Sequence, residues 1–157
     1  MKKKTRIMFL GIVLLFAVAM SGCGVSQKTP ESVVESLVKS YVGGSEKKVK
    51  KCYTQETDTN ELLQKEIDAT MKYFAAHEPS KVKVDKCDTL SENEDYTYVY
   101  ILYNLVLSND QEYPCIGTYM VKKDGSKYYV MAPSEITDDL RKQAAADYAK
   151  FMTTDSY

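Results

Sequence analysis

After an apolar N-terminal segment, hydrophobic residues recur at helical spacing and predict a first helix beginning at Pro30. Thr29 suits the N-cap, Pro30 suits the first helical position, and the charge of Glu31 complements the helix dipole. The pair Gly43-Gly44 ends this helix. Its apolar stripe contains Val34, Leu37, Val38 and Tyr41.

Two more helices are predicted before Pro79, which acts as a stop. Ser45 is placed to cap a short one, whose buried side contains Val49, Cys52 and Tyr53. Asp58 followed by Glu61 resembles a capping box for a longer one. The apolar stripe of this third helix contains Leu63, Ile67, Met71 and Phe74.

The period changes from helical to alternating after Pro79, which predicts a four-stranded antiparallel meander and then a last helix. The strands are expected near residues 82–90, 96–107, 112–122 and 127–131, with Asp124-Gly125 as a strong hairpin signal. Thr137 begins the final helix, which presents Leu140, Ala144, Tyr148 and Phe151 on one side. This order of elements indicates an α+β fold.

The N-terminal segment has a cationic start, an apolar run at residues 7–20 and the sequence Ser21-Gly22-Cys23, the layout of a secretory signal peptide. It resembles the lipobox of bacterial lipoproteins, which implies a diacylglyceryl group on the Cys23 thiol and cleavage just before it. An uncleaved transmembrane anchor and plain secretion are the alternatives. The run of 14 residues is shorter than the roughly 20 that span a bilayer. We therefore expect a lipoprotein that carries fatty acyl chains such as palmitate, is anchored in the cell membrane and faces outside the cytoplasm.

This interpretation divides the chain into a signal peptide at residues 1–22, the lipidated cysteine with a short polar tether at 23–29, and one domain at 30–157. Removal of residues 1–22 from the 157 leaves 135 residues, and the net charge falls from −1 to −5 because Lys2, Lys3, Lys4 and Arg6 leave. A mildly acidic domain gains little from phosphate backbones or anionic headgroups. We expect no nucleic-acid partner.

Several of these motifs together resemble small bacterial lipoproteins with a nuclear transport factor two-like, or cystatin-like, domain. They are the Thr-Pro-Glu helix start, the pair Val33-Val34, the Gly43-Gly44 break, the Lys-rich second helix that ends at Cys52-Tyr53, and the antiparallel sheet. The resemblance implies N-terminal helices packed on a strongly curved four-stranded sheet to form a cone, with the C-terminal helix as an addition. It says little about activity, since this fold hosts isomerases, dehydratases and transport adaptors.

The central strand places Val99, Ile101, Tyr103, Leu105 and Leu107 on one face, which should meet the helices. Tyr96, Tyr98 and Tyr100 lie on the opposite face, where a one-sided sheet would carry polar residues. Two interpretations are open. Either the C-terminal helix buries these rings, or they form a binding face for sugars, peptides or a second protomer of a homodimer.

The sequence evidence for catalytic groups is weaker than the evidence for a binding face. Tyr41, Tyr53, Tyr73, Asp68 and His77 are the residues that could reach a cavity inside the cone. His77 precedes a helix stop, where capping the last carbonyl groups is the commoner role. The sequence contains no nucleophile elbow, phosphate loop or metal-spaced ligand set, and residues 91–95 lack the pattern of a calcium loop. We expect no enzyme activity, cofactor or metal.

Three cysteines remain after Cys23, and an exported protein can join two of them. Cys87 and Cys115 should lie on strands separated by another, roughly 9 to 10 Å apart and beyond disulfide reach. A bridge would therefore join Cys52 to Cys87 or Cys115. The alternative is that all three are small buried hydrophobic residues.

The sequence thus predicts a membrane-anchored extracytoplasmic lipoprotein that acts as a binding or interaction module of the cell envelope. Its expected partners are the membrane, through the lipid anchor, and an envelope protein, glycan or peptide. The alternative function is a small-molecule enzyme of the isomerase or dehydratase type that uses the cone cavity. A pocket lined by convergent ionisable groups would favour the enzyme, and an apolar or closed cone would favour the binding module.

Overall fold

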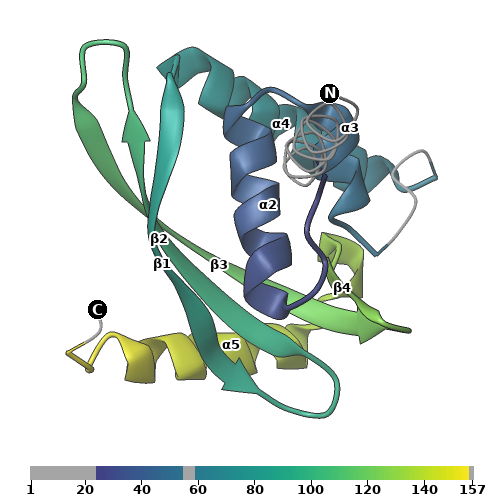
Figure 1. The fold of residues 1–157 in the computed structure, drawn as a ribbon. Coiled ribbons are helices and arrows are strands. Elements are labelled where there is room, and N and C mark those ends of the chain that lie inside the picture. The colour runs from purple at the N-terminus through teal and green to yellow at the C-terminus, as the bar shows by residue number, and fades with distance from the viewer. Residues whose placement is uncertain (1–23, 55–58, 156–157) are drawn as a thin grey trace, which may run out of the picture.

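Three helices open the computed structural model, which describes residues 24–54 and 59–155 (Figure 1). They are α2 (Pro30–Val42), α3 (Glu46–Lys51) and α4 (Glu61–His77). The strands β1 (Lys81–Glu92), β2 (Thr97–Val106), β3 (Glu112–Asp124) and β4 (Lys127–Val130) follow, then the 3-10 turn η1 (Pro133–Glu135) and α5 (Asp138–Phe151). The order predicted from the sequence is confirmed.

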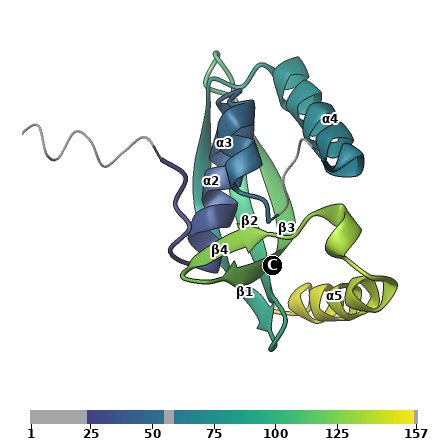
Figure 2. The same cartoon turned by 90° about the vertical axis from the view of Figure 1, so that its right-hand side faces the viewer.

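The four strands form one antiparallel sheet in the order β1-β2-β3-β4. The sheet twists and curves around α2, and α5 lies on its other side (Figures 1 and 2). β4 is short and pairs with β3 only at Val121–Asp124, so the rest of β3 forms an edge. The predicted α+β architecture, with helices on a curved four-stranded sheet and an added C-terminal helix, is confirmed.

The helix caps agree with the sequence at α2 and α5 and differ at α3 and α4. Ser45 occupies the N-cap position of α3, but its side chain makes no capping hydrogen bond. Thr29 and Ser32 form a reciprocal capping box at the start of α2. At α4 the N-cap is Asn60, whose side chain accepts a hydrogen bond from the N–H of Leu63 at 3.0 Å. The prediction of Asp58 as the cap is therefore wrong, and Asp58 itself lies outside the described residues. Asn is as good a cap as Asp, and Asn60 immediately precedes the helix.

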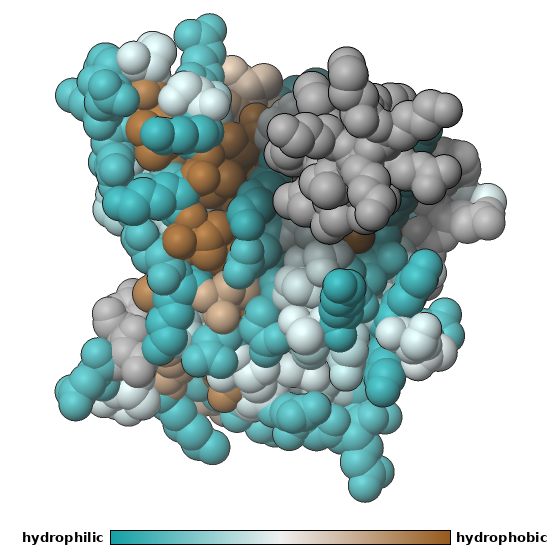
Figure 3. Space-filling view, viewed as in Figure 1, coloured by the Kyte–Doolittle hydropathy of each residue, from teal (hydrophilic) through white to brown (hydrophobic). Residues whose placement is uncertain are grey.

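Two hydrophobic cores lie on the two faces of the sheet. The larger one joins the helices to the inner face of β2, including Val99, Ile101, Tyr103 and Leu105, as predicted. The smaller one lies between the outer face and α5 and includes Tyr96, Tyr98 and Ala144. On the side seen in Figure 3, hydrophobic side chains reach the surface in a band beside α2, and hydrophilic side chains cover much of the remainder.

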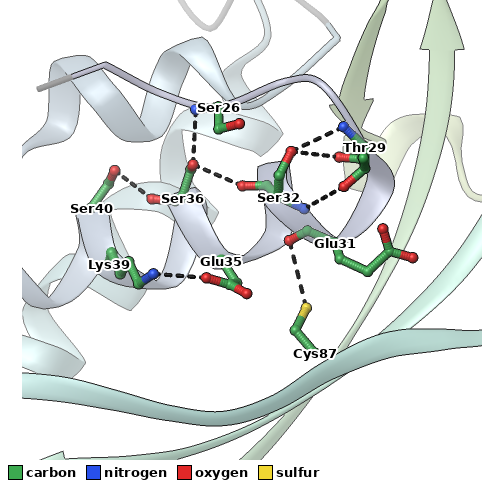
Figure 4. A network of polar contacts seen from close by, with 9 residues as sticks. All are labelled: Ser26, Thr29, Glu31, Ser32, Glu35, Ser36, Lys39, Ser40 and Cys87. Atoms are coloured by element: carbon green, nitrogen blue, oxygen red, sulfur yellow. Dashed lines mark hydrogen bonds and ion pairs between the residues drawn. The ribbon is translucent and has the colours of Figure 1, made fainter. Parts of the chain in front are cut away.

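The segment at 24–29, predicted to be a tether, is attached to the domain. The Ser26 N–H donates to Ser36 Oγ of α2 at 2.9 Å (Figure 4). The Gln27 side chain donates to the carbonyl of Lys51, and the Tyr128 N–H of β4 donates to the Gln27 carbonyl, each at 3.0 Å. Val25 packs against the larger core. These contacts correct the expectation of a free tether, because backbone polar groups here are satisfied by the domain.

No helix within residues 24–54 and 59–155 is long and apolar enough to cross a membrane. The lipobox and Cys23 lie outside the described residues.

Candidate functional site

A cavity of about 230 Å³ opens at the edge of β3, where β4 ends and leaves part of that strand without a partner. Its walls come from α4, β3, the chain after β4 and the first turn of α5. Because neither sheet face closes over this edge, side chains of both cores meet there. The lining residues are Tyr53, Glu66, Thr118, Tyr119, Met120, Val130, Met131, Pro133, Ile136 and Arg141.

Two tyrosines from different helical segments form the polar contact behind this cavity. The hydroxyl groups of Tyr41 in α2 and Tyr53 after α3 are 3.0 Å apart, and both residues are buried. The Tyr41 ring also stacks on Phe74 of α4, with centroids 5.9 Å apart. Burial raises the pKa of Tyr41 to about 12 and raises the pKa of Tyr53 far above its ordinary range. Both hydroxyls therefore stay protonated and can donate hydrogen bonds.

Tyr119 of β3 is the third tyrosine of the site. Its ring lies over Gly117, where a Cβ atom would come within 3.0 Å of the ring. Glycine at that position therefore makes room for the ring, and any larger residue would force it to shift. Burial also raises the pKa of the Tyr119 hydroxyl above its ordinary range.

Glu66 of α4 supplies the carboxylate of the cavity. No hydrogen bond or ion pair joins its side chain to another residue in the described ranges. Partial burial raises the pKa of Glu66, and its charge in turn contributes to the raised pKa values of Tyr41, Tyr53 and Tyr119. The site therefore combines an unpaired carboxylate with neutral hydroxyl donors.

Glu135 fixes the wall that follows β4. Its carboxylate accepts hydrogen bonds from the Ala132 N–H at 2.7 Å and from Lys122 Nζ at 2.8 Å, and also from the Thr54 hydroxyl. Burial opposes ionisation, but these donors hold the pKa of Glu135 below its ordinary value. The carboxylate thus joins β3, η1 and the segment after α3. Arg141, on the opposite wall, is held by Asp138 at 2.8 Å.

Only two of the five residues proposed as candidate catalytic groups lie in this site. Tyr53 lines the cavity and Tyr41 lies behind it, bonded to Tyr53, whereas Tyr73, Asp68 and His77 are exposed elsewhere on α4. His77 Nδ1 donates to the Tyr73 carbonyl at 2.8 Å, which is the capping role expected at a helix end. Sequence reasoning missed Glu66, Tyr119 and Arg141, because residues so far apart in the chain carry no shared local signal.

The predicted binding face of Tyr96, Tyr98 and Tyr100 is covered. These residues are 3%, 7% and 3% exposed, respectively, because α5 packs across the outer sheet face. The Tyr100 ring lies 4.4 Å from that of Phe151 in α5. Of the two interpretations, the structure shows burial of these rings under the C-terminal helix. The prediction of an exposed binding face is therefore wrong.

A second, more open cavity of about 340 Å³ lies between β1 and the end of α5, with Tyr100 and Phe151 among its lining residues. Lys86 Nζ lies 5.5 Å from the centroid of the Tyr100 ring in this region. Its charged groups, Lys86, Asp88, Asp147 and Lys150, are of both signs and border open solvent. We therefore regard the cavity with the tyrosines and Glu66 as the candidate site.

The three described cysteines are free. The structure therefore does not contain the possible disulfide from Cys52 to Cys87 or Cys115. Cys52 is fully buried, and its thiol donates to the Lys48 carbonyl at 3.3 Å within its own helix. The Cys87 thiol points to the Glu31 carbonyl of α2 at 3.5 Å (Figure 4). Cys115 pairs with Tyr103 on β2, the strand that separates it from Cys87. Within the described ranges, no His, Cys, Asp and Glu side chains cluster as metal ligands.

Comparisons with known proteins find structural likeness only. No family model matches the sequence, and no curated protein matches it. A Campylobacter jejuni protein proposed to be an NTF2-like transpeptidase is 15% identical, with a TM-score of 0.47 over 66% of this chain and 97% of that one. An NTF-2 like protein of unknown function from Shewanella oneidensis is 16% identical, with a TM-score of 0.43 over 63% and 89%. At this distance the likeness says nothing about activity.

Proposed function

We propose that this protein is a lipid-anchored binding module on the outer side of the cell membrane, with the cavity at the β3 edge as its ligand site. The anchor is inferred from the Ser21-Gly22-Cys23 sequence and the apolar run before it. Residues 25–27 contact the larger core, α2, α3 and β4, so the chain is attached to the domain from two residues after Cys23 in the sequence.

The observation that carries the ligand site is the convergence of Glu66, Tyr53 and Tyr119 on one cavity. The cavity lies between α4 and the start of α5, on the side away from the segment at 24–29 (Figure 2). A ligand could therefore enter while the domain remains next to the membrane.

The lining favours a small ligand that has both polar and apolar groups. The tyrosine hydroxyls can donate hydrogen bonds to a ligand, and Glu66 can accept hydrogen bonds from it. Met120, Met131 and Ile136 provide contacts for the apolar groups of the ligand. A fragment of an envelope glycan or peptide has this character. A hydrogen bond to the Glu66 carboxylate would contribute roughly 1.5–3 kcal/mol.

Methionine methyl groups allow a direct test, because Met120 and Met131 line the cavity whereas Met152 lies exposed after α5. We expect titration with glycan fragments and short peptides to shift the methyl NMR signals of Met120 and Met131 and to leave that of Met152 in place. Glu66→Gln should weaken binding at least about tenfold. Asp68→Asn, which removes a carboxylate from the same helix outside the cavity, should not. Shifts confined to other methyl groups would contradict the site.

The anchor has a separate test. Cells grown with labelled palmitate should label the wild-type protein, and Cys23→Ala should remove the label. A mature N-terminus at any other residue would contradict the lipoprotein interpretation.

One observation favours an enzyme as the second candidate. The pKa of Glu66 is raised beside hydroxyl donors of raised pKa, an arrangement suited to moving a proton to or from a substrate. An isomerase or dehydratase reaction would then depend on Glu66. Turnover of a bound ligand, lost at least about a hundredfold in Glu66→Gln, would establish this alternative.

A further inference from the structure

Lysines are concentrated on the outward face of α3. Lys47, Lys48 and Lys51 are exposed, and their spacing places them on the side of the helix opposite the buried Val49. The fourth lysine of this helix, Lys50, is engaged by Glu46 at 3.0 Å.

The segment at 24–29 lies directly beside this face. Gln27 bonds to the carbonyl of Lys51 on one side and to the N–H of Tyr128 on the other. The neighbours Lys28 and Lys127 are also exposed. Together with the three lysines of α3 they form what we call the basic face: Lys28, Lys47, Lys48, Lys51 and Lys127.

Within the described parts of the chain, no ion pair joins any lysine of the basic face to a carboxylate. The nearest described acidic groups in sequence are Glu31, which accepts a hydrogen bond from Thr89, Glu46, which pairs with Lys50, and Asp124, which lies opposite Lys127 in the β3–β4 hairpin. The exposed acidic residues Glu92, Glu94 and Asp95 lie at the β1–β2 turn, at the other end of the molecule from α3 (Figures 1 and 2).

We propose that the basic face contacts the anionic headgroups of the membrane in which the lipid anchor is inserted. This inference rests on the proposed lipidation of Cys23, which is bonded to Gly24 at the start of the attached segment. Val25, two residues after Cys23 in the sequence, packs against the larger core, so little free chain separates the proposed anchor from the domain. An anionic surface attracts cations over a Debye length of about 8 Å, so lysines next to the attached segment would be drawn toward the headgroups around the anchor.

The mature net charge of −5 suggested that the domain gains nothing from an anionic surface. The distribution of charge changes that conclusion, because attraction depends on the groups that face the membrane. An anionic membrane attracts the basic face and repels the acidic β1–β2 turn. Both effects favour an orientation in which α3 faces the membrane. This orientation leaves the cavity between α4 and α5 on the solvent side.

Amine modification of the full, lipidated protein in vesicles tests the orientation. The protein is reconstituted in phosphatidylcholine alone and in phosphatidylcholine mixed with phosphatidylglycerol, and each lysine's rate of acetylation is read by mass spectrometry. We expect all five lysines of the basic face to react about fivefold more slowly in the anionic vesicles. Lys65, Lys72 and Lys142 on α4 and α5 should react equally in both. Salt at about 1 M should remove the protection.

A matched pair of variants checks that the lysines cause the orientation. The triple variant Lys47→Gln, Lys48→Gln, Lys51→Gln should abolish the protection of Lys28 and Lys127 in anionic vesicles. The control Lys65→Gln, Lys72→Gln, Lys142→Gln, which removes the same charge from exposed positions elsewhere, should retain it.

The outcomes separate this inference from the proposed anchor. Absence of palmitate labelling on the wild-type protein would overturn both. A labelled protein whose basic face reacts equally in neutral and anionic vesicles would overturn only the contact with anionic headgroups. Protection in both kinds of vesicle alike would mean that the anchor alone, and not charge, sets the orientation.

Discussion

The hydroxyl groups of Tyr41 and Tyr53 lie 3.0 Å apart inside the larger core, beside the candidate ligand cavity. Tyr41 lies near the C-terminal end of α2, and Tyr53 lies in the segment after α3 that forms a bridge to Val130 of β4. This contact connects the helices to the sheet edge at which the cavity opens. It therefore links the stability of the fold to the geometry of the site.

Removing one hydroxyl of this pair leaves the other without that partner. We expect Tyr41→Phe and Tyr53→Phe each to lower the free energy of unfolding by about 1–2 kcal/mol. The double variant should cost less than the sum, with a coupling of about 1 kcal/mol. Urea denaturation measures all three, and Tyr113→Phe, at a position that is 50% exposed, is the control. Strictly additive losses would contradict the contact.

Glu66 should make stability depend on pH. Partial burial raises its pKa above the ordinary 4.5 in the folded chain, so the folded state binds this proton more tightly than the unfolded state. The contribution of Glu66 to stability therefore falls as the pH rises from the unfolded-state pKa through the raised folded-state pKa. The loss persists at higher pH.

Glu66→Gln should consequently raise the melting temperature at about pH 7 and change it little at about pH 4. The gain should be only a fraction of a kcal/mol, because the side chain is only partly buried and solvent screens its charge. Asp68→Asn is the control on the same helix. A gain from Glu66→Gln that is equal at both pH values would show that the carboxylate is not desolvated.

Tyr96 and Tyr98 share one buried sheet face but differ in their hydroxyl groups. The Tyr98 hydroxyl donates to Thr118 Oγ1 at 2.9 Å. The Tyr96 hydroxyl is buried and makes no hydrogen bond of normal geometry within the described residues. Burial raises its pKa, and a polar contact with the Asn93 side chain only partly opposes that rise. We expect Tyr98→Phe to lower the free energy of unfolding by about 1 kcal/mol and Tyr96→Phe to raise it by a similar amount. Equal effects in thermal denaturation would contradict this difference.

The N-cap of α4 can be distinguished from the alternative suggested by the sequence. Asn60→Ala should lower the free energy of unfolding by about 1 kcal/mol, because it removes the acceptor for the Leu63 N–H. Asn60→Asp should retain most of the stability, since Asp caps equally well. A larger loss from Asp58→Ala than from Asn60→Ala would restore Asp58 as the cap.

The buried thiols should be unreactive in the native protein. Burial raises the pKa of both Cys52 and Cys87 to about 12, so little thiolate forms near neutral pH. Burial raises the pKa of Cys115 less, because hydrogen bonds from Tyr103 and the Leu105 backbone oppose the rise, so Cys115 should be alkylated first by iodoacetamide. Intact mass spectrometry without reductant should find all three thiols free, and a mass lower by two hydrogen atoms would reveal a disulfide.

Local spacing in the sequence was sufficient to predict the elements and their order. The Thr29 cap, the Gly43-Gly44 stop, the change of period after Pro79 and the Asp124-Gly125 hairpin act through neighbouring residues, so their effects can be read from one stretch of chain. The same spacing assigned Val99 and Ile101 to the inner sheet face. It could not say whether the other face was covered, since that depends on where α5 packs.

Tertiary structure decided the site and the charge distribution. Glu66, Tyr119 and Arg141 converge only because β4 is short and leaves the β3 edge open between α4 and α5. The lysines of α3 lie near Lys28 and Lys127 only because Gln27 is bonded to the carbonyl of Lys51 and to the N–H of Tyr128. A periodic pattern determines which face of a helix or strand is apolar. Long-range packing determines which of these faces come into contact. The ligand site and the basic face both depend on that packing, so local spacing in the sequence could not predict them.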